Sequence, residues 1–401
     1  MSADWLSGKA AIVGIGHTAF GKRGEFAERG TFSLVLEAIQ KACDDAGISP
    51  KQIDGWSSYS NDPNQGAMLS AMMGCDRLRF TAMGWGGGGG AMGGAFMYAA
   101  MAVATGQADY VCILRGATMP GNARFGGMGR PGDGPPHGMI SPGNSFALAA
   151  RRHMARFGTT TEHFGEIAIN ARRNAANNPN ARFRDEITME DHHASQLICD
   201  PLRKMDFCME SDFGTAIIVT SKERAKDSKH EPVSLLSMAM GGPPRWGDAW
   251  FGQAAADPSG MGSAVGGHMC DDDDYVTGGY RTLAQDLYNK SGLGPDDVDV
   301  ALLYDHFTPM VIMAIEDFQF CKKGEGGPFV AEGNIRREGK IPVNTHGGNL
   351  AEVYAHGMTH MMEGVRQLRG DSPNQLDNPQ VAVIAAGASM APTGAIMLGK
   401  M

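Results

Sequence analysis

The sequence has no pair of cysteines spaced closely enough to indicate a metal site or a disulfide framework. Its seven cysteines are scattered singly, whereas a zinc knuckle or a secreted disulfide scaffold requires close pairs. No apolar run approaches the roughly 20 residues that a membrane span needs, and the N-terminus has no apolar signal core. Lysine and arginine form no long block, and the formal charge of -9 argues against a protein that neutralises nucleic-acid phosphates. We therefore expect a cytoplasmic protein with mostly buried, reduced thiols.

Glycine and methionine are plentiful. With 401 residues, of which 42% are hydrophobic and 20% charged, the chain is typical of a globular protein large enough for two core-bearing halves. The 56 glycines indicate tight turns and close backbone packing, and the 27 methionines indicate adaptable apolar surface suited to a bulky, lipid-like ligand. Neither count is specific to one function.

The richest set of chemically capable side chains lies in residues 344–358. A pair of adjacent glycines precedes a helix-like run there, and such a turn lets the backbone approach a ligand while the helix start offers free N–H groups. This arrangement can hold an oxyanion, although a glycine turn feeding a packed helix explains the same pattern. The candidate residues of this stretch are Asn344, His346, Gly347, Gly348, Tyr354 and His356.

Hydrophobic periodicity predicts alternating strands and helices in the first third of the chain. Residues 9–16 and 110–114 are predicted to be buried strands, and residues 31–46 an amphipathic helix. A dinucleotide loop at 14–16 is disfavoured because the next helix begins too late to place its N-terminus on a pyrophosphate. The glycine run at 86–90 lacks a following Gly-Lys-Ser/Thr, which argues against a P-loop.

The middle of the chain reads as a loop followed by helices. The Gly- and Pro-rich residues 117–142 predict a long loop, the usual place for a lid or pocket wall, and a helical region is expected over 145–175. Residues 191–193, Asp-His-His, are interpreted as solvated helix surface because adjacent histidines on a helix point in different directions. The acidic run at 271–274 is interpreted as a solvated loop, since nothing nearby supplies a fixed set of cation ligands.

An internal repeat divides the chain. Residues 44–54 and 289–299 share a Gly-apolar-x-Pro-x-x-apolar-Asp frame, and each copy follows an amphipathic helix. We predict an α/β fold of two similar βαβ-type halves, each a helix-covered and mostly parallel sheet with ligands at the strand C-terminal ends. The halves are expected to cover residues 1–230, with a loop or lid region over about 117–210, and residues 231–401.

This pattern resembles the thiolase superfamily, in particular its lipid-transfer-protein or sterol-carrier-protein branch, over essentially the whole chain. Thiolases of that branch have Asn-x-x-Gly-Gly, five residues and then a catalytic histidine, a position that is Tyr354 here. Their His-Asp-Cys-Phe or Asn-Glu-Ala-Phe motif corresponds to residues 304–307, which begin with Tyr304. Their two catalytic cysteines correspond to Gly89 and Ala385. The resemblance implies a layered α/β/α/β/α core in which every catalytic position has been replaced, so that no acyl-enzyme can form there.

Tyrosines at both former catalytic positions resemble the steroid side-chain-cleaving aldolases of this superfamily. That resemblance implies retro-aldol cleavage of a β-hydroxyacyl-CoA with a bulky hydrophobic body, giving a ketone or aldehyde and a shorter acyl-CoA. It also implies a homodimer joined to a small acyl-CoA-binding partner with OB-fold and zinc-ribbon character. No cofactor or metal is expected in this chain, and the CoA thioester is the substrate.

A retro-aldol reaction needs a base for the β-hydroxyl proton, donors for the enolate oxygen and an acid for the α-carbon. Tyr304 is assigned as the base and Tyr354 as the acid, with the reverse assignment left open. The neighbouring histidines would stabilise the phenolate, the glycine backbone would face the thioester oxygen, and the missing side chain at Gly89 would open space for the substrate. The residues expected at the substrate are Gly89, His306, Asn344, His346, Gly347, Gly348, His356 and Gly387.

Three alternatives remain at this point. The tyrosines could merely fill a dead site, as packed core tyrosines do. The protein could carry a lipid or acyl-CoA in the same pocket without turnover. It could also be a Claisen or acyltransfer enzyme with a different nucleophile, for which Cys321 is the cysteine near the Tyr304 motif.

Overall fold

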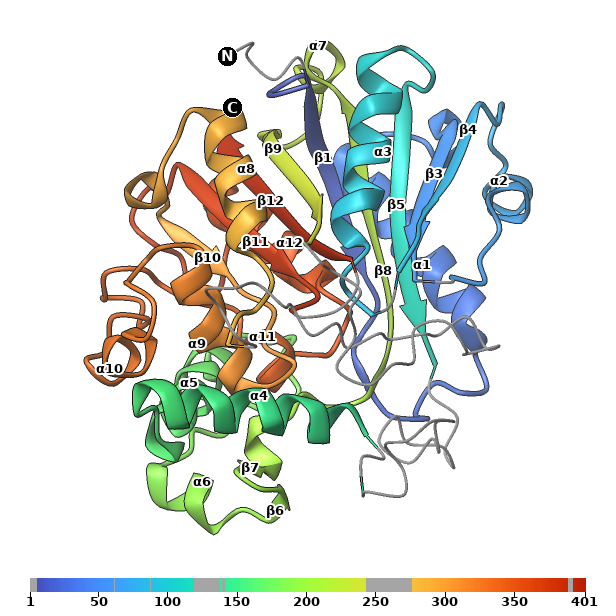
Figure 1. Ribbon diagram of the computed structural model, residues 1–401. Coiled ribbons are helices and arrows are strands. Elements are labelled where there is room, and N and C mark those ends of the chain that lie inside the picture. The colour runs from blue at the N-terminus through green and yellow to red at the C-terminus, as the bar shows by residue number, and fades with distance from the viewer. Residues whose placement is uncertain are drawn as a thin grey trace.

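Figure 1 shows a computed structural model of the protein, which describes residues 6–60, 62–86, 88–118, 138, 141–242, 276–388 and 392–401. Most of the predicted loop at 117–142 and the acidic run at 271–274 lie outside these residues. No helix in the described parts of the chain is long and apolar enough to cross a membrane.

The first half consists of strands and helices that begin and end close to their predicted bounds. Its elements are β1 (Ala10–His17), β2 (Gly21–Lys22), α1 (Gly30–Ala46), a 3-10 turn (Pro50–Gln52), β3 (Gly55–Tyr59), α2 (Gly66–Met73), β4 (Phe80–Gly84), α3 (Met92–Ala104), β5 (Tyr110–Ala117), β8 (Ser211–Ser221) and α7 (Lys222–Ala225). The second half comprises β9 (Val233–Gly241), α8 (Arg281–Ser291), a 3-10 turn (Pro295–Asp297), β10 (Val300–Leu302), α9 (Thr308–Asp317), α10 (Gly326–Ala331), α11 (Gly348–Ala351), α12 (Met358–Arg369), β11 (Val381–Ala386) and β12 (Thr393–Lys400).

The internal repeat predicted from the sequence is present. In both copies a helix ends at a left-handed glycine, Gly47 (φ 74°) or Gly292 (φ 75°), because glycine adopts that conformation without strain. A 3-10 turn opened by proline follows, and then a strand at the parallel end of the sheet, β3 or β10.

The described strands form one sheet in the order β10-β11-β12-β9-β1-β8-β5-β3-β4, with β2 beside β8. The expectation of a mostly parallel sheet is wrong. Only the two ends are parallel, where β3 pairs with β4 and β5 and where β10 pairs with β11. From β5 to β11 every described neighbour is antiparallel, because β8 returns after a long insertion and β12 folds back directly on β11.

Helices cover this sheet in layers, as the resemblance implied. Helix α3 packs on β3, β4 and β5 on one side and on β9 and β12 on the other, and α12 packs on β10, β11, β12 and β8. Both helices therefore lie between the two parts of the sheet, in an apolar core that includes Phe96 and Met361. Helix α1 covers β1, β8 and β5 from outside, and α8 covers β9 and β12. The result is the layered α/β/α/β/α core.

An insertion between β5 and β8 lies against the second half (green in Figure 1, below α9–α11). Its elements are α4 (Pro142–Phe157), α5 (Thr161–Ala176), α6 (Met189–Ala194), β6 (Leu197–Cys199), β7 (Leu202–Arg203) and a 3-10 turn (Lys204–Asp206). The helical region expected over 145–175 is two helices, since Gly158 ends α4 in the left-handed conformation. His192, expected on the solvated surface, is instead buried, and its Nε2 lies 2.9 Å from Oδ1 of Asp206.

Candidate active site

Two tyrosines that are fifty residues apart in the sequence meet at their hydroxyl groups. Tyr304 follows strand β10, and Tyr354 lies in the short connection between α11 and α12. The Tyr304 hydroxyl donates a hydrogen bond of 3.2 Å to the Tyr354 oxygen, and the ring planes are nearly perpendicular. Tyr304 is fully buried and Tyr354 is partly buried, so the two hydroxyl groups are largely shielded from water.

The glycine turns of the two halves converge on this pair. A Cβ added at Gly89 would lie 2.4 Å from Cε2 and 2.8 Å from the hydroxyl oxygen of Tyr304. A Cβ at Gly387, whose φ is +71°, would lie 2.2 Å from the Gly90 Cα. The expectation that Gly89 leaves room for substrate is therefore wrong, because the Tyr304 ring already fills the space that a side chain at residue 89 would take.

Asn344 positions the strand end that carries Tyr304. Its side-chain oxygen accepts from the Leu303 N–H and its amide group donates to the Leu303 carbonyl, both at 2.8 Å. The side chain is buried and paired with backbone on both sides. This corrects the expectation that Asn344 binds substrate: it fixes the residue next to Tyr304.

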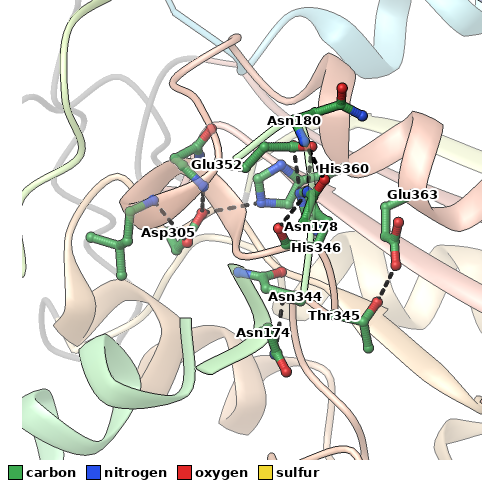
Figure 2. Close-up of polar contacts among 12 residues, drawn as sticks. Asn174, Asn178, Asn180, Asp305, Asn344, Thr345, His346, Glu352, His360 and Glu363 are labelled. Carbon is green, nitrogen blue, oxygen red and sulfur yellow. Dashed lines mark hydrogen bonds and ion pairs between the residues drawn. The ribbon is translucent and has the colours of Figure 1, made fainter. Parts of the chain in front are cut away.

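The start of α11 binds a carboxyl group of the protein itself, that of Asp305 (Figure 2). The Asp305 carboxylate accepts from the N–H groups of Asn349 (2.8 Å) and Leu350 (3.3 Å). A Cβ at Gly348 would lie 2.0 Å from Asp305 Oδ2, so only glycine allows this approach. Gly347 donates its N–H to the Asn344 carbonyl at 2.8 Å. Asp305 thus occupies the N–H groups of Asn349 and Leu350, and the expectation that the Gly347–Gly348 turn binds the thioester oxygen stays a prediction.

Behind Asp305 lies a row of buried imidazole and carboxyl groups (Figure 2). His360 Nε2 is 3.1 Å from Asp305 Oδ1, and its ring stands edge-on to the His346 ring at 4.8 Å. His346 Nε2 lies 3.7 Å from Oε2 of Glu352, whose other oxygen accepts from Asn178 at 2.8 Å. Burial lowers the pKa of His346 and raises that of Glu352 to about 7. His346 thus belongs to this inner row, which corrects its expected place at the substrate.

His356 and Arg115 lie on the Tyr354 side. The His356 ring meets the Tyr354 ring edge to face with centroids 4.9 Å apart, and its Nδ1 accepts from Arg115 Nε at 3.0 Å. Arg115 Nη1 also donates to the Tyr59 carbonyl (2.9 Å) and pairs with Asp62 (3.2 Å). Arg115 was not among the predicted residues. Its place near the C-terminal end of β5 is the available signal, since ligands gather at such ends.

His306 and Cys208 lie on the Tyr304 side. The His306 ring is 4.9 Å from the Tyr304 ring and 4.5 Å from Phe146, and burial lowers its pKa to about 3, so it is neutral. The Cys208 N–H donates to the His306 carbonyl at 2.9 Å. Charge on the Cys208 sulfur would raise the pKa of both tyrosines, which places the thiol beside them. Nothing in the sequence distinguished Cys208 from the other cysteines.

The surroundings of the two phenols differ in a way that favours ionisation of Tyr354. Burial raises the pKa of both groups above the usual value. The hydrogen bond between them raises the pKa of Tyr304, the donor, and lowers that of Tyr354, the acceptor. The Arg115 charge lowers the pKa of Tyr354 further. Of the two phenols, Tyr354 therefore loses its proton more readily than Tyr304.

Comparisons with known proteins show the family of the chain. A family model described as thiolase C-terminal domain-like matches residues 263–400. The 17-hydroxy-3-oxo-4-pregnene-20-carboxyl-CoA lyase of Mycobacterium tuberculosis is 39% identical over 98% of this chain and 100% of that protein. The chain belongs to the thiolase superfamily. A steroid side-chain-cleaving aldolase of Thermomonospora curvata is 37% identical over 98% of both chains.

Solved structures show the same membership. The structure described as Ltp2-ChsH2(DUF35) aldolase matches with a TM-score of 0.87 and 36% identity, covering 99% of both chains. Human mitochondrial 3-ketoacyl-CoA thiolase matches 99% of this chain with a TM-score of 0.68 at 14% identity, which shows the shared thiolase fold. Neither Gly89 nor Ala385, the residues that the sequence predicts at the two cysteine positions of thiolases, has a side chain that can form an acyl-enzyme.

Proposed function

We propose that the protein cleaves a carbon–carbon bond of a β-hydroxyacyl-CoA with a bulky, steroid-like body by a retro-aldol reaction. The products are a ketone or aldehyde and a shorter acyl-CoA. The observation that carries the proposal is the direct contact between the Tyr304 and Tyr354 hydroxyls, at the two positions where thiolases carry other catalytic groups. The full-length identity of 37–39% to a carboxyl-CoA lyase and a side-chain-cleaving aldolase supports it.

The two tyrosines can complete a proton cycle without another group. The Tyr354 phenolate takes the β-hydroxyl proton, the Cα–Cβ bond breaks, and its electron pair moves into the thioester as an enolate. Tyr304 then gives its proton to the α-carbon and recovers one from Tyr354 through their hydrogen bond. This assignment reverses the first expectation from the sequence, because Tyr354 accepts the hydrogen bond and lies nearer the Arg115 charge.

The cysteines argue against a Claisen or acyltransfer enzyme. Burial raises the pKa of Cys321 to about 12, and its charged neighbours are glutamates and lysines rather than the tyrosines. Burial also raises the pKa of Cys208, the thiol beside the pair, well above its usual value. Both thiols stay protonated at neutral pH, whereas the thiolate is the nucleophile.

The proposal includes two kinds of partner. A small acyl-CoA-binding protein of OB-fold and zinc-ribbon character is supported by the structure described as Ltp2-ChsH2(DUF35) aldolase. A homodimer is supported by exposed apolar side chains beside β4, the end strand of the described sheet. These side chains are Met68, Met72, Met83 and Trp85, the last 80% exposed.

The test is product analysis by mass spectrometry after incubation of the protein and its co-expressed partner with a panel of β-hydroxy steroid acyl-CoAs. Tyr304→Phe and Tyr354→Phe each remove one hydroxyl and are expected to lower turnover by about 10²- to 10⁴-fold. Tyr288→Phe is the matched control, since its hydroxyl bonds the Phe318 carbonyl, outside the tyrosine pair. Substrate that binds to the wild-type protein and is recovered uncleaved would favour a carrier instead.

A further inference from the structure

The hydrogen bond between Arg115 and His356 fixes the tautomer of this histidine. A guanidinium group has N–H donors and no acceptor, so the Nδ1 atom that faces Arg115 Nε at 3.0 Å must be the unprotonated acceptor. A neutral ring then carries its hydrogen on Nε2. Burial and the Arg115 charge both lower the pKa of His356, so the ring stays neutral around pH 7.

The ring is held firmly in place. Arg115 is itself tied down by the Tyr59 carbonyl and the Asp62 carboxylate. On the backbone side, the His356 carbonyl accepts from the Tyr59 hydroxyl at 3.0 Å. The guanidinium and the histidine backbone are thus both anchored to the β3 end of the first half, and His356 cannot turn its ring without breaking the Arg115 bond.

The opposite nitrogen, Nε2, is a donor that bonds no other residue in the part of the chain that the structure describes. Within the described residues, the bond from Arg115 is the one hydrogen bond that the His356 ring makes. Only 4% of the residue is exposed, so most of the His356 ring is shielded from water. The ring stands edge to face against the ring of Tyr354, with the centroids 4.9 Å apart. A ligand at the pair is therefore well placed to supply the acceptor.

We propose that His356 is a neutral oxyanion donor whose Nε2–H binds the substrate's thioester oxygen, and that Arg115 is the positioning residue that sets its tautomer. This inference rests on the proposed retro-aldol function. The β-hydroxyl and the thioester oxygen are 1,3-related, so the groups that serve them should be neighbours, as Tyr354 and His356 are. No proton leaves His356 in the reaction. Its N–H strengthens its hydrogen bond as the Cα–Cβ electron pair reaches the thioester oxygen.

A neutral imidazole suits this task. An imidazolium would give its proton to the enolate oxygen and divert the proton that the α-carbon must receive. A neutral N–H polarises the carbonyl and keeps its hydrogen, which is how a neutral histidine can act as an electrophile. The Arg115 guanidinium sets the tautomer through its Nε–H bond to His356, while its Nη1 group is engaged by the Tyr59 carbonyl and the Asp62 carboxylate.

The first arm of the test reads the tautomer directly by ¹⁵N NMR of the histidine-labelled protein in complex with its partner, with His356→Gln identifying the signal. We expect Nε2 protonated and Nδ1 unprotonated from pH 6 to pH 8. In Arg115→Met, Nδ1 should become partly protonated, and Arg115→Lys should restore much of the wild-type pattern. A hydrogen on Nδ1 in the wild-type protein would overturn the inference.

The second arm measures turnover and binding. His356→Leu should lower kcat by about 10²- to 10³-fold, and His356→Gln, which keeps an N–H donor, should recover at least about tenfold of that loss. A substrate analogue with a thioether in place of the thioester should bind His356→Leu and the wild-type protein equally. His193→Gln, a partly exposed histidine on α6, is the control and should keep wild-type turnover.

The outcomes separate the inference from the proposed function. A folded His356→Leu variant with wild-type kcat refutes the donor role while the retro-aldol function stands. A wild-type protein that shows the expected tautomer but cleaves none of the substrates refutes the retro-aldol function. That result would support only the role of Arg115 in setting the tautomer of His356.

Discussion

The large side chain of Tyr304 occupies the space beside Gly89, which has no side chain of its own. The atoms of Tyr304 nearest a Cβ at residue 89 are at its reactive end: Cε2, Cζ and the hydroxyl oxygen. A side chain at residue 89 and a tyrosine at residue 304 therefore exclude one another. Glycine at residue 89 is thus a condition for the observed position of the Tyr304 ring.

Gly89→Ala tests this complementarity. The new methyl group would force the Tyr304 ring away from Tyr354, since the Cβ would lie 2.4 Å from the ring. We expect a loss of about 1–3 kcal/mol in the free energy of unfolding, measured by urea denaturation. Turnover should fall about as far as in Tyr304→Phe.

Gly294→Ala is the matched control, because its Cβ would meet only Asp297 Oδ2 at 3.8 Å. It should leave stability and turnover near wild type. Wild-type activity in Gly89→Ala would show that Tyr304 is free to move and would contradict the packing described above.

At the scale of single elements, the short helix α11 is held at both ends by buried carboxyl groups. Asp305 binds the N–H groups at its start, and Glu352 is the residue at its end. A buried carboxylate is costly unless it is paired. Asp305 has two N–H donors and His360, whereas Glu352 faces Asn178 and the uncharged His346. This difference explains why burial raises the pKa of Glu352 to about 7.

The raised pKa of Glu352 predicts a pH dependence of stability. The folded state binds more protons than the unfolded state between the two pKa values, from about 4.5 to about 7, so the contribution of Glu352 is lost as the pH rises through about 7. The side chain of Glu352→Gln stays neutral at every pH. The free energy of unfolding of the variant minus that of the wild type should therefore be roughly 2–3 kcal/mol larger at pH 8 than at pH 5.

Urea denaturation of both proteins at the two pH values measures this gain, and other titrating groups cancel in the difference. Glu338→Gln, at an exposed site beside Arg173, should show no such gain. A wild-type-to-variant difference that is the same at pH 5 and pH 8 would mean that Glu352 is ionised throughout.

At the scale of the whole molecule, one edge of the described sheet carries a group of exposed apolar side chains. The end strand β4 alternates between inward residues and outward ones such as Met83, and α2 beside it exposes Met68 and Met72. An edge strand with exposed apolar neighbours is a template for pairing with another chain. The proposed homodimer would cover this edge.

Charge at this edge should separate the protomers. Met72→Glu combined with Met83→Glu is expected to shift the mass measured by multi-angle light scattering from dimer to monomer, because the charges would be buried without partners. Leu197→Glu, on the exposed strand β6 of the insertion, should leave the mass unchanged. A dimer that persists in the double variant would place the interface elsewhere.

The sequence by itself determined the repeat, most element bounds and the two tyrosines. These are local properties: apolar periodicity, glycine ends of helices and motif spacing act over a few residues. Gly47 and Gly292 end their helices in the same way because each needs only its own turn. The thiolase-like motif spacing likewise singles out Tyr304 and Tyr354, whose hydroxyls are in contact in the structure.

Only the tertiary structure decided which groups touch the tyrosines. Arg115 and His356 are 241 residues apart, and the packing of the sheet layers brings them together. The same packing lets Tyr304 fill the space beside Gly89, and it turns the Asp305 carboxylate onto the start of α11. A buried polar atom must bond the partner that the fold places within reach, and no local pattern in the sequence specifies that partner.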